Sequence, residues 1–174
     1  MNTTQIIAQG FGILGLIIIV LSFQFKENKK FFIFQGLGGL LFFLNFIMIG
    51  AVAGALFNLT NFVRGALFSK NRKKLWKLIV AETLYTFCFV FSIFTGDLNL
   101  FKIFISFLPY IALVFMSICM WKGNEKHIRY HQIIYMSPAW IVHNIFNFSL
   151  GGLICETMNI ISSVVALARQ KKEL

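Results

Sequence analysis

Residues 54–65 read GALFNLTNFVRG, and residues 152–163 read GLICETMNIISS. Each segment places small or polar residues four, seven and eleven positions after its first glycine, within an otherwise apolar run. Residues with this spacing lie on one face of an α-helix. The two segments therefore predict two apolar helices, 98 positions apart in the chain, that carry matching polar faces.

The composition of the whole chain is typical of a membrane protein. Of its 174 residues, 58% are hydrophobic and 13% are charged, whereas a soluble domain has about 25% charged residues. The net charge of +10 comes from basic clusters between long uncharged runs, which is the pattern of membrane proteins rather than of nucleic-acid-binding ones. The composition argues against a disordered chain, a coiled coil and a water-soluble enzyme, and we expect a lipid bilayer and no nucleic acid as partner.

A transmembrane helix needs about 20 apolar residues, so 174 residues with short loops hold at most seven of them. We expect the helices at residues 4–25, 31–49, 54–69, 75–95, 99–121, 127–148 and 152–169. The uncharged stretch 31–63 is interrupted by a turn around Gly50–Gly54. The first run has no preceding basic residue and no cleavage site, so it predicts a retained span rather than a signal peptide.

The basic residues predict the orientation of the chain. With seven spans, 14 of the 16 Lys and Arg residues fall in clusters at 26–30, 70–77, 122–129 and 169–172, all on one side. Basic residues are retained in the cytoplasm. We therefore expect a bacterial inner-membrane protein with its N-terminus outside and its C-terminus in the cytoplasm.

The match between the two polar segments extends into an internal repeat. Leu44-Asn45-Phe46-Ile47 corresponds to Val142-His143-Asn144-Ile145 at the same offset of 98 positions. An odd number of helices per repeat with one extra helix between them gives the repeats the same orientation. We therefore predict an all-α fold of two parallel three-helix bundles, residues 1–72 and 98–174, joined by a linker helix at 73–97, which is a known transporter plan.

The polar faces of the third and seventh helices predict a solute site in mid-membrane. Polar side chains inside lipid usually face a bundle interior or a cavity. The carboxamides of Asn61 and Asn159 are the centre of this site; the alternative is that they hold helices together. The candidate binding residues are Asn58, Asn61, Arg64, Trp140, His143, Glu156 and Asn159. For Trp140, stacking on a solute ring and simple packing remain equally good interpretations.

Three ionisable residues within the spans are costly to bury. Arg64 and Glu82 lie at matching depths from the cytoplasmic side, which predicts an ion pair between the third and fourth helices. Alternatively, Arg64 receives an acidic group of the solute. Glu156 has no basic residue at its depth, and a carboxylate without such a partner often takes up a proton. Proton coupling through Glu156 is therefore a hypothesis.

Four helix-weakening residues, Gly15, Gly38, Pro109 and Pro138, predict hinges for alternating access, with close packing as the alternative. The histidines at 127 and 131 lack a third metal ligand. We find no nucleophile–base pair and no pair of acidic residues for catalysis. We therefore expect no enzyme, no metal and no cofactor.

Several stretches of the chain resemble the bacterial inner-membrane family called YgjV. They are Ala8-Gln9-Gly10-Phe11-Gly12, Leu44–Ala51, Asn61-Phe62-Val63-Arg64, Trp140-Ile141-Val142-His143-Asn144, the pair Gly151-Gly152, and Glu156. That family is similar in plan to the SWEET/SemiSWEET and PQ-loop superfamily, in which an Asn on the third helix of each repeat lines the sugar site. The resemblance implies this role for Asn61 and Asn159. The proline-glutamine dipeptide of the superfamily is replaced here by Ser22-Phe23-Gln24.

The sequence thus predicts a SWEET-like transporter that moves a small polar solute, such as a sugar or sugar acid, by rocking two three-helix bundles. A non-transporting receptor or scaffold that binds a small ligand or peptide is the alternative. The sequence is compatible with a monomer or a homodimer.

Overall fold

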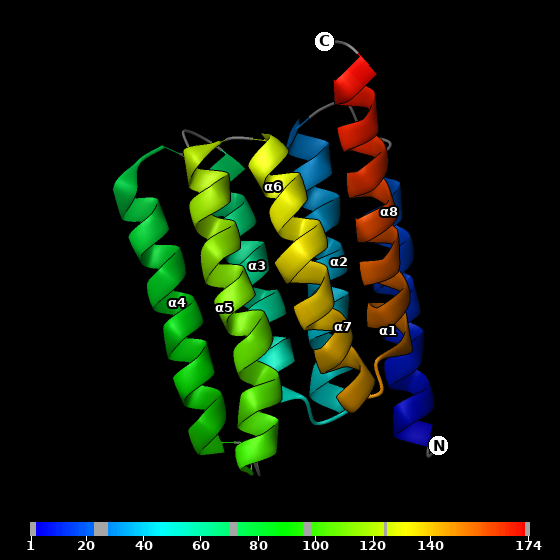
Figure 1. The fold of residues 1–174 in the computed structure, drawn as a ribbon. Coiled ribbons are helices and arrows are strands. Elements are labelled where there is room, and N and C mark those ends of the chain that lie inside the picture. Colours follow the sequence, from blue (N-terminus) through cyan, green and yellow to red (C-terminus); the bar gives the residue numbers. More distant parts are fainter. Residues whose placement is uncertain (1–2, 23–27, 70–72, 96–98, 124, 173–174) are drawn as a thin grey trace.

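The computed structural model describes residues 3–22, 28–69, 73–95, 99–123 and 125–172, and these residues form an all-helical bundle (Figure 1). Its elements are α1 (Thr3–Ser22), α2 (Asn28–Met48), α3 (Val52–Ser69), α4 (Leu75–Thr95), α5 (Leu100–Lys122), α6 (Glu125–His131), the π-helix η1 (Gln132–Met136), α7 (Ser137–Phe146) and α8 (Leu150–Lys172). Because α6, η1 and α7 follow one another without a gap, they form one continuous rod, called here the α6–α7 rod.

The rods pack in chain order around a ring. Each rod contacts the next one along the chain, and α8 contacts α1, which closes the ring. The start of α1 and the end of α8 lie at opposite ends of the bundle (Figure 1). Along the shorter way round, α1 and α2 stand between α3 and α8, so the two helices with the matching polar faces lie across the ring from each other.

Several helices are suited to a lipid environment. Among the described residues, four segments have the length and hydropathy of a membrane span: Thr3–Leu21, Leu75–Thr95, Leu100–Lys122 and Leu150–Arg169. Ile33–Met48 is a shorter apolar helix. Large apolar side chains point outward along the bundle, including Phe87, Phe94 and Phe104. Such a surface indicates contact with lipid rather than with water.

The helix boundaries agree with the sequence prediction to within a few residues. One difference is Gly54, which was expected in the turn and lies within α3. The turn itself comes earlier, at Gly50, whose φ of 78° favours glycine. The predicted loops at 26–30, 70–74, 95–97 and 122–126 include residues 26–27, 70–72, 96–97 and 124, which lie outside the described residues.

The turns between α2 and α3 and between α7 and α8 have the same hydrogen bonds. In the first turn, the N–H of Ala51 donates to the carbonyl oxygen of Phe46 at 2.8 Å. Ninety-eight positions later, the N–H of Ser149 donates to the carbonyl oxygen of Asn144 at 3.0 Å. Gly50 and Phe148, again 98 positions apart, both have positive φ, 78° and 54°. The offset seen in the sequence therefore also relates two turns of the same backbone conformation.

The predicted helix at 127–148 is confirmed as a continuous rod, but the rod is not α-helical throughout. The N–H of Ser137 donates to the carbonyl oxygen of Gln132, five residues earlier, within the π-helix η1. Pro138 follows at once and has no N–H to donate. The π-turn accommodates the missing hydrogen bond at the proline. It also places Gln132 and Ser137 on one side of the rod.

The glycines predicted as hinges lie at a close contact between α1 and α2. A methyl group on Gly15 would approach the carbonyl oxygen of Gly38 to 3.2 Å, and one on Gly38 would lie 2.4 Å from a carbon of Ile19. This geometry favours the packing interpretation for both glycines. Pro109 is fully buried within α5. A hinge role for Pro109 and Pro138 stays a prediction.

Candidate functional site

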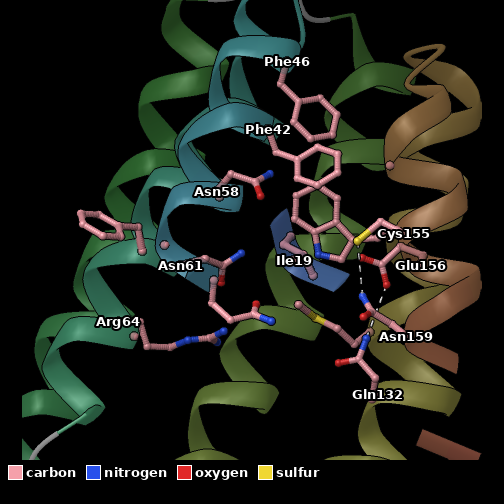
Figure 2. A pocket seen from close by; sticks show the side chains of 18 of the residues that line it. Ile19, Phe42, Phe46, Asn58, Asn61, Arg64, Gln132, Cys155, Glu156 and Asn159 are labelled. Atoms are coloured by element: carbon pink, nitrogen blue, oxygen red, sulfur yellow. Dashed lines mark hydrogen bonds between the residues drawn. The ribbon is translucent and has the colours of Figure 1, made fainter. Parts of the chain in front are cut away.

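A cavity of about 270 Å³ lies inside the bundle between α3 and α8. Figure 2 shows Asn58, Asn61 and Arg64 on one wall, facing Cys155, Glu156 and Asn159 on the other. The remaining lining residues include Ile19, Gln35, Phe42, Phe46, Gln132, Met136, Trp140 and Asn144. Of the seven candidate binding residues, all except His143 line this cavity. The structure thus brings them together, while their binding of a solute stays a prediction.

The α8 wall contains a carboxylate held by the neighbouring rod. The hydroxyl of Ser137 donates to Oε2 of Glu156 at 2.7 Å. Nε2 of Gln132 donates to Oγ of Ser137 at 2.8 Å and lies 3.4 Å from the same Glu156 oxygen. The π-turn is what places both donors beside the carboxylate. Asn159, one turn further along α8, makes a long contact of 3.9 Å to Sγ of Cys155, interacts with the Glu156 carboxylate, and lines the cavity.

The α3 wall carries two amides with different partners. Nδ2 of Asn58 donates to the carbonyl oxygen of Gly54 in its own helix at 2.9 Å. Oδ1 of Asn61 accepts a bond of 2.6 Å from the hydroxyl of Tyr85 on α4. Tyr85 is fully buried. This bond fixes the oxygen of Asn61 and leaves its NH2 group for other partners.

Arg64 is bound by neutral groups and not by Glu82. Its Nη1 donates to the hydroxyl of Ser117 on α5 at 3.1 Å, and its guanidinium carbon lies 5.6 Å from the centre of the Tyr85 ring. Nε of Arg64 and both carboxylate oxygens of Glu82 are buried without a hydrogen-bond partner. No hydrogen bond therefore joins the predicted ion pair of Arg64 and Glu82, because the guanidinium is directed to Ser117 and Tyr85, and the two charges interact only through space.

Aromatic side chains close the end of the cavity nearest the α2–α3 turn. The rings of Phe46, Trp140 and His143 form a mutual cluster with centroid distances of 5.3–5.8 Å. His143 is fully buried, and its Nδ1 has no hydrogen-bond partner. The His143 ring packs against α3 at Gly54. A methyl group on Gly54 would come within 2.7 Å of that ring, so this position requires glycine. His143, one of the candidate binding residues, is part of this aromatic barrier.

A second cavity lies beyond the aromatic barrier. Its lining includes His143, Lys102, Asn99 and Asn147, together with the two turns at 49–53 and 146–150. Trp140 and Phe46 line the first cavity, whereas His143 lines the second. The barrier is therefore an aromatic layer between two cavities, each of which has several polar side chains in its lining.

A buried polar network joins three helices beside the barrier. Nδ2 of Asn45 donates to the carbonyl oxygen of Ala8 at 2.7 Å, and its Oδ1 accepts from the hydroxyl of Ser149 at 2.8 Å. Gln9 accepts a bond from the N–H of Leu150 at 3.0 Å. These bonds connect α1, α2 and the turn before α8. Asn45 is fully buried, so here the packing interpretation of the membrane asparagines holds.

Sequence reasoning missed two partners of Glu156. Gln132 and Ser137 are spaced by five residues, which an α-helix does not place on one face but a π-turn does. The proline at 138 was the available signal, since it removes the regular hydrogen bond at that point. Gln35 and Met136 were also missed, as part of the wide apolar surfaces of α2 and the α6–α7 rod.

Comparison with known proteins gives the family of the chain. No curated protein and no solved structure matches it significantly. One family model does match, that of a bacterial inner membrane protein, and it covers residues 6–173. The apolar helices and outward-facing aromatic residues agree with this assignment. The chain belongs to the bacterial inner membrane protein family Imp-YgjV.

Proposed function

We propose that this protein transports a small polar solute across the inner membrane and performs no chemistry on it. In this proposal all seven rods span the membrane, as two three-helix bundles joined by α4, like the SWEET plan. The N-terminus is outside and the C-terminus is in the cytoplasm.

One observation carries the proposal: a polar cavity lies within an apolar bundle. Polar groups in a membrane interior are costly unless a cavity or a partner satisfies them. Amides from α3, α8 and the α6–α7 rod converge on the cavity between α3 and α8. Unlike Asn45, which bridges α1 and the turn before α8, Asn61 and Asn159 have no hydrogen bond to each other across the cavity. A bound solute would satisfy them.

The aromatic barrier supports alternating access. It separates the solute cavity from the second cavity, which lies at the end of the bundle where α1 begins. Rocking of one three-helix unit against the other would part Phe46 on α2 from Trp140 and His143 on α7. The proposed site would then connect to the second cavity.

Solute counterflow tests the proposal. The purified protein is reconstituted in proteoliposomes loaded with unlabelled sugars, sugar acids or amino acids, and uptake of the labelled compound is measured. We expect Asn61→Ala and Asn159→Ala to lower uptake about tenfold each, since each removes hydrogen bonds to the solute. Tyr85→Phe keeps the Asn61 amide and should retain most of the uptake.

A matched control for these variants is Thr157→Ala. Thr157 is exposed on the outside of α8 and bonds to its own helix at Leu153, so its removal should leave uptake unchanged. If the asparagine variants transport as well as the wild type, the site assignment fails. Binding of a solute without any counterflow would favour the receptor instead.

A further inference from the structure

Two opposite charges line the solute cavity without pairing with each other. Arg64 on α3 and Glu156 on α8 are the charged residues among its described lining. The bonds of Arg64 go to Ser117, and those of Glu156 go to Ser137 and Gln132. Figure 2 shows the two side chains on facing walls, both directed inward. A guanidinium and a carboxylate held apart across one cavity form a bipolar site.

Neither charged group has a partner of opposite charge among the described residues that line the cavity. Arg64 is 8% exposed, and its buried Nε has no partner, although a guanidinium offers five N–H donors. Glu156 accepts on Oε2 from Ser137 and Gln132 and interacts with the amide of Asn159, and no basic side chain pairs with it among the described residues of the cavity. Leaving such groups unpaired in a low-dielectric interior is expensive. A ligand that brings one charge of each sign relieves both costs.

On the basis of the proposed function, we infer that the solute is a zwitterion of the amino-acid class, with its carboxylate at Arg64 and its ammonium group at Glu156. An arginine binds a carboxylate in two-point geometry. The ring of Trp140 lines the same cavity as Glu156, and an aromatic face stabilises an ammonium group. Amides of Asn61 and Asn159 lie between the two charges and serve the remaining polar atoms.

Other solute classes fit less well. A neutral sugar would offer no opposite charge to either group inside the cavity. An anion would meet Glu156, and a simple amine would meet Arg64. Glu82 lies within electrostatic reach of Arg64 from α4 but does not line the cavity. Glu82 thus offsets the positive charge of Arg64 from outside the cavity, and the place for the solute carboxylate stays open.

The test compares four compounds with one carbon skeleton: alanine, lactate, alaninol and propane-1,2-diol. Alanine carries both charges, lactate only the carboxylate, alaninol only the ammonium group, and the diol neither. The twenty common amino acids and the ω-amino acids with longer charge separation complete the panel. Binding is measured by calorimetry and thermal shift on the purified full-length protein, and transport by counterflow in proteoliposomes. We expect a zwitterion to bind at least about tenfold more tightly than its singly charged analogues.

Two variants sharpen the test. Arg64→Gln should abolish the preference for the carboxylate, so that the amine analogue binds as well as the zwitterion. Glu156→Gln should do the reverse and favour the acid analogue. Thr157→Ala should keep the wild-type order. Elution of each variant as a single species shows that it is folded.

The outcomes separate this inference from the proposed function. Zwitterion binding without counterflow would keep the inference and reject transport. Counterflow of a sugar or diol without binding of any zwitterion would keep transport and overturn the inference. Binding of no member of the panel would also overturn it, as would parallel losses for all compounds in both charge variants.

Discussion

Gly50 and Phe148 occupy the same position in two turns with the same hydrogen bonds, yet different side chains pack around those turns. In the first half, Gly54 makes room for the ring of His143. In the second half, the equivalent Gly152 makes room for the amide of Asn144. The two turns thus share a backbone conformation, whereas the side chains packed around them differ. The difference extends to the cavity walls, where Arg64 lies on α3 and Glu156 on α8.

The largest loss of stability is expected at Gly151, a glycine of the second half whose equivalent in the first half is not glycine. A methyl group on Gly151 would lie 2.4 Å from the backbone carbon of Gly12, whereas the equivalent position in the first half is Ala53. Gly151→Ala should force α1 and α8 apart and cost about 3 kcal/mol. Thermal unfolding in detergent measures this cost.

Gly10→Ala is the control for that experiment, because nothing lies within 4 Å of the added methyl group. It should be neutral or slightly stabilising, since alanine favours helices. Equal melting temperatures for the two variants would show that the α1–α8 contact is not as close as described.

A smaller loss of stability is expected when the buried hydrogen bonds of Asn45 are removed. Asn45→Ala removes the bonds to Ala8 and Ser149 and leaves buried polar groups unpaired, at a cost of about 2 kcal/mol. Asn147→Ala removes only a bond to the carbonyl oxygen of His143 within its own turn. A chemical-denaturation midpoint that falls as much for Asn147→Ala as for Asn45→Ala would contradict the bridging role of Asn45.

The equivalent turns at Gly50 and Phe148 should change stability in opposite directions when glycine is removed from one and introduced into the other. Gly50→Ala places a side chain at positive φ and should destabilise the protein by about 1 kcal/mol. Phe148→Gly should stabilise it by a similar amount, because the Phe148 side chain is 80% exposed and loses little packing. Unfolding midpoints of the two variants should therefore lie on opposite sides of the wild type. Shifts in the same direction would mean that the turns are not equivalent.

The smallest loss of stability is expected when the amide of Asn61 on the α3 wall loses its partner. Tyr85→Phe removes the 2.6 Å bond to Asn61 but leaves the Asn61 oxygen beside the cavity, where another partner can reach it. We expect a loss of stability of about 0.5 kcal/mol. A much larger loss in a melting experiment would indicate that Asn61 is a packing residue like Asn45.

The sequence predicted the helices well, because they follow from hydrophobic periodicity, whereas the meeting of the polar faces of α3 and α8 followed from the internal repeat. The polar residues at 58, 61, 156 and 159 were identified by their spacing alone. His143 could not be placed, since its direction depends on the absence of a side chain at Gly54 on another helix. The Arg64–Glu82 pair was inferred from depth alone, and depth does not show which way a long side chain turns.

The π-turn was the main feature that periodicity could not reveal. A 3.6-residue repeat places Gln132 and Ser137 on different faces, and only the inserted residue before Pro138 brings them together. The partners of Glu156 therefore depend on a local irregularity.

Thiol accessibility tests the central claim, a polar cavity between α3 and α8, most directly. In a chain whose three cysteines are replaced by serine, Asn159→Cys is compared with Ile161→Cys, which is 58% exposed on the outside of the same helix. A small water-soluble thiol reagent applied to membrane vesicles of both orientations should modify position 159 and spare position 161, which faces lipid. Modification of 161 but not of 159 would contradict the account.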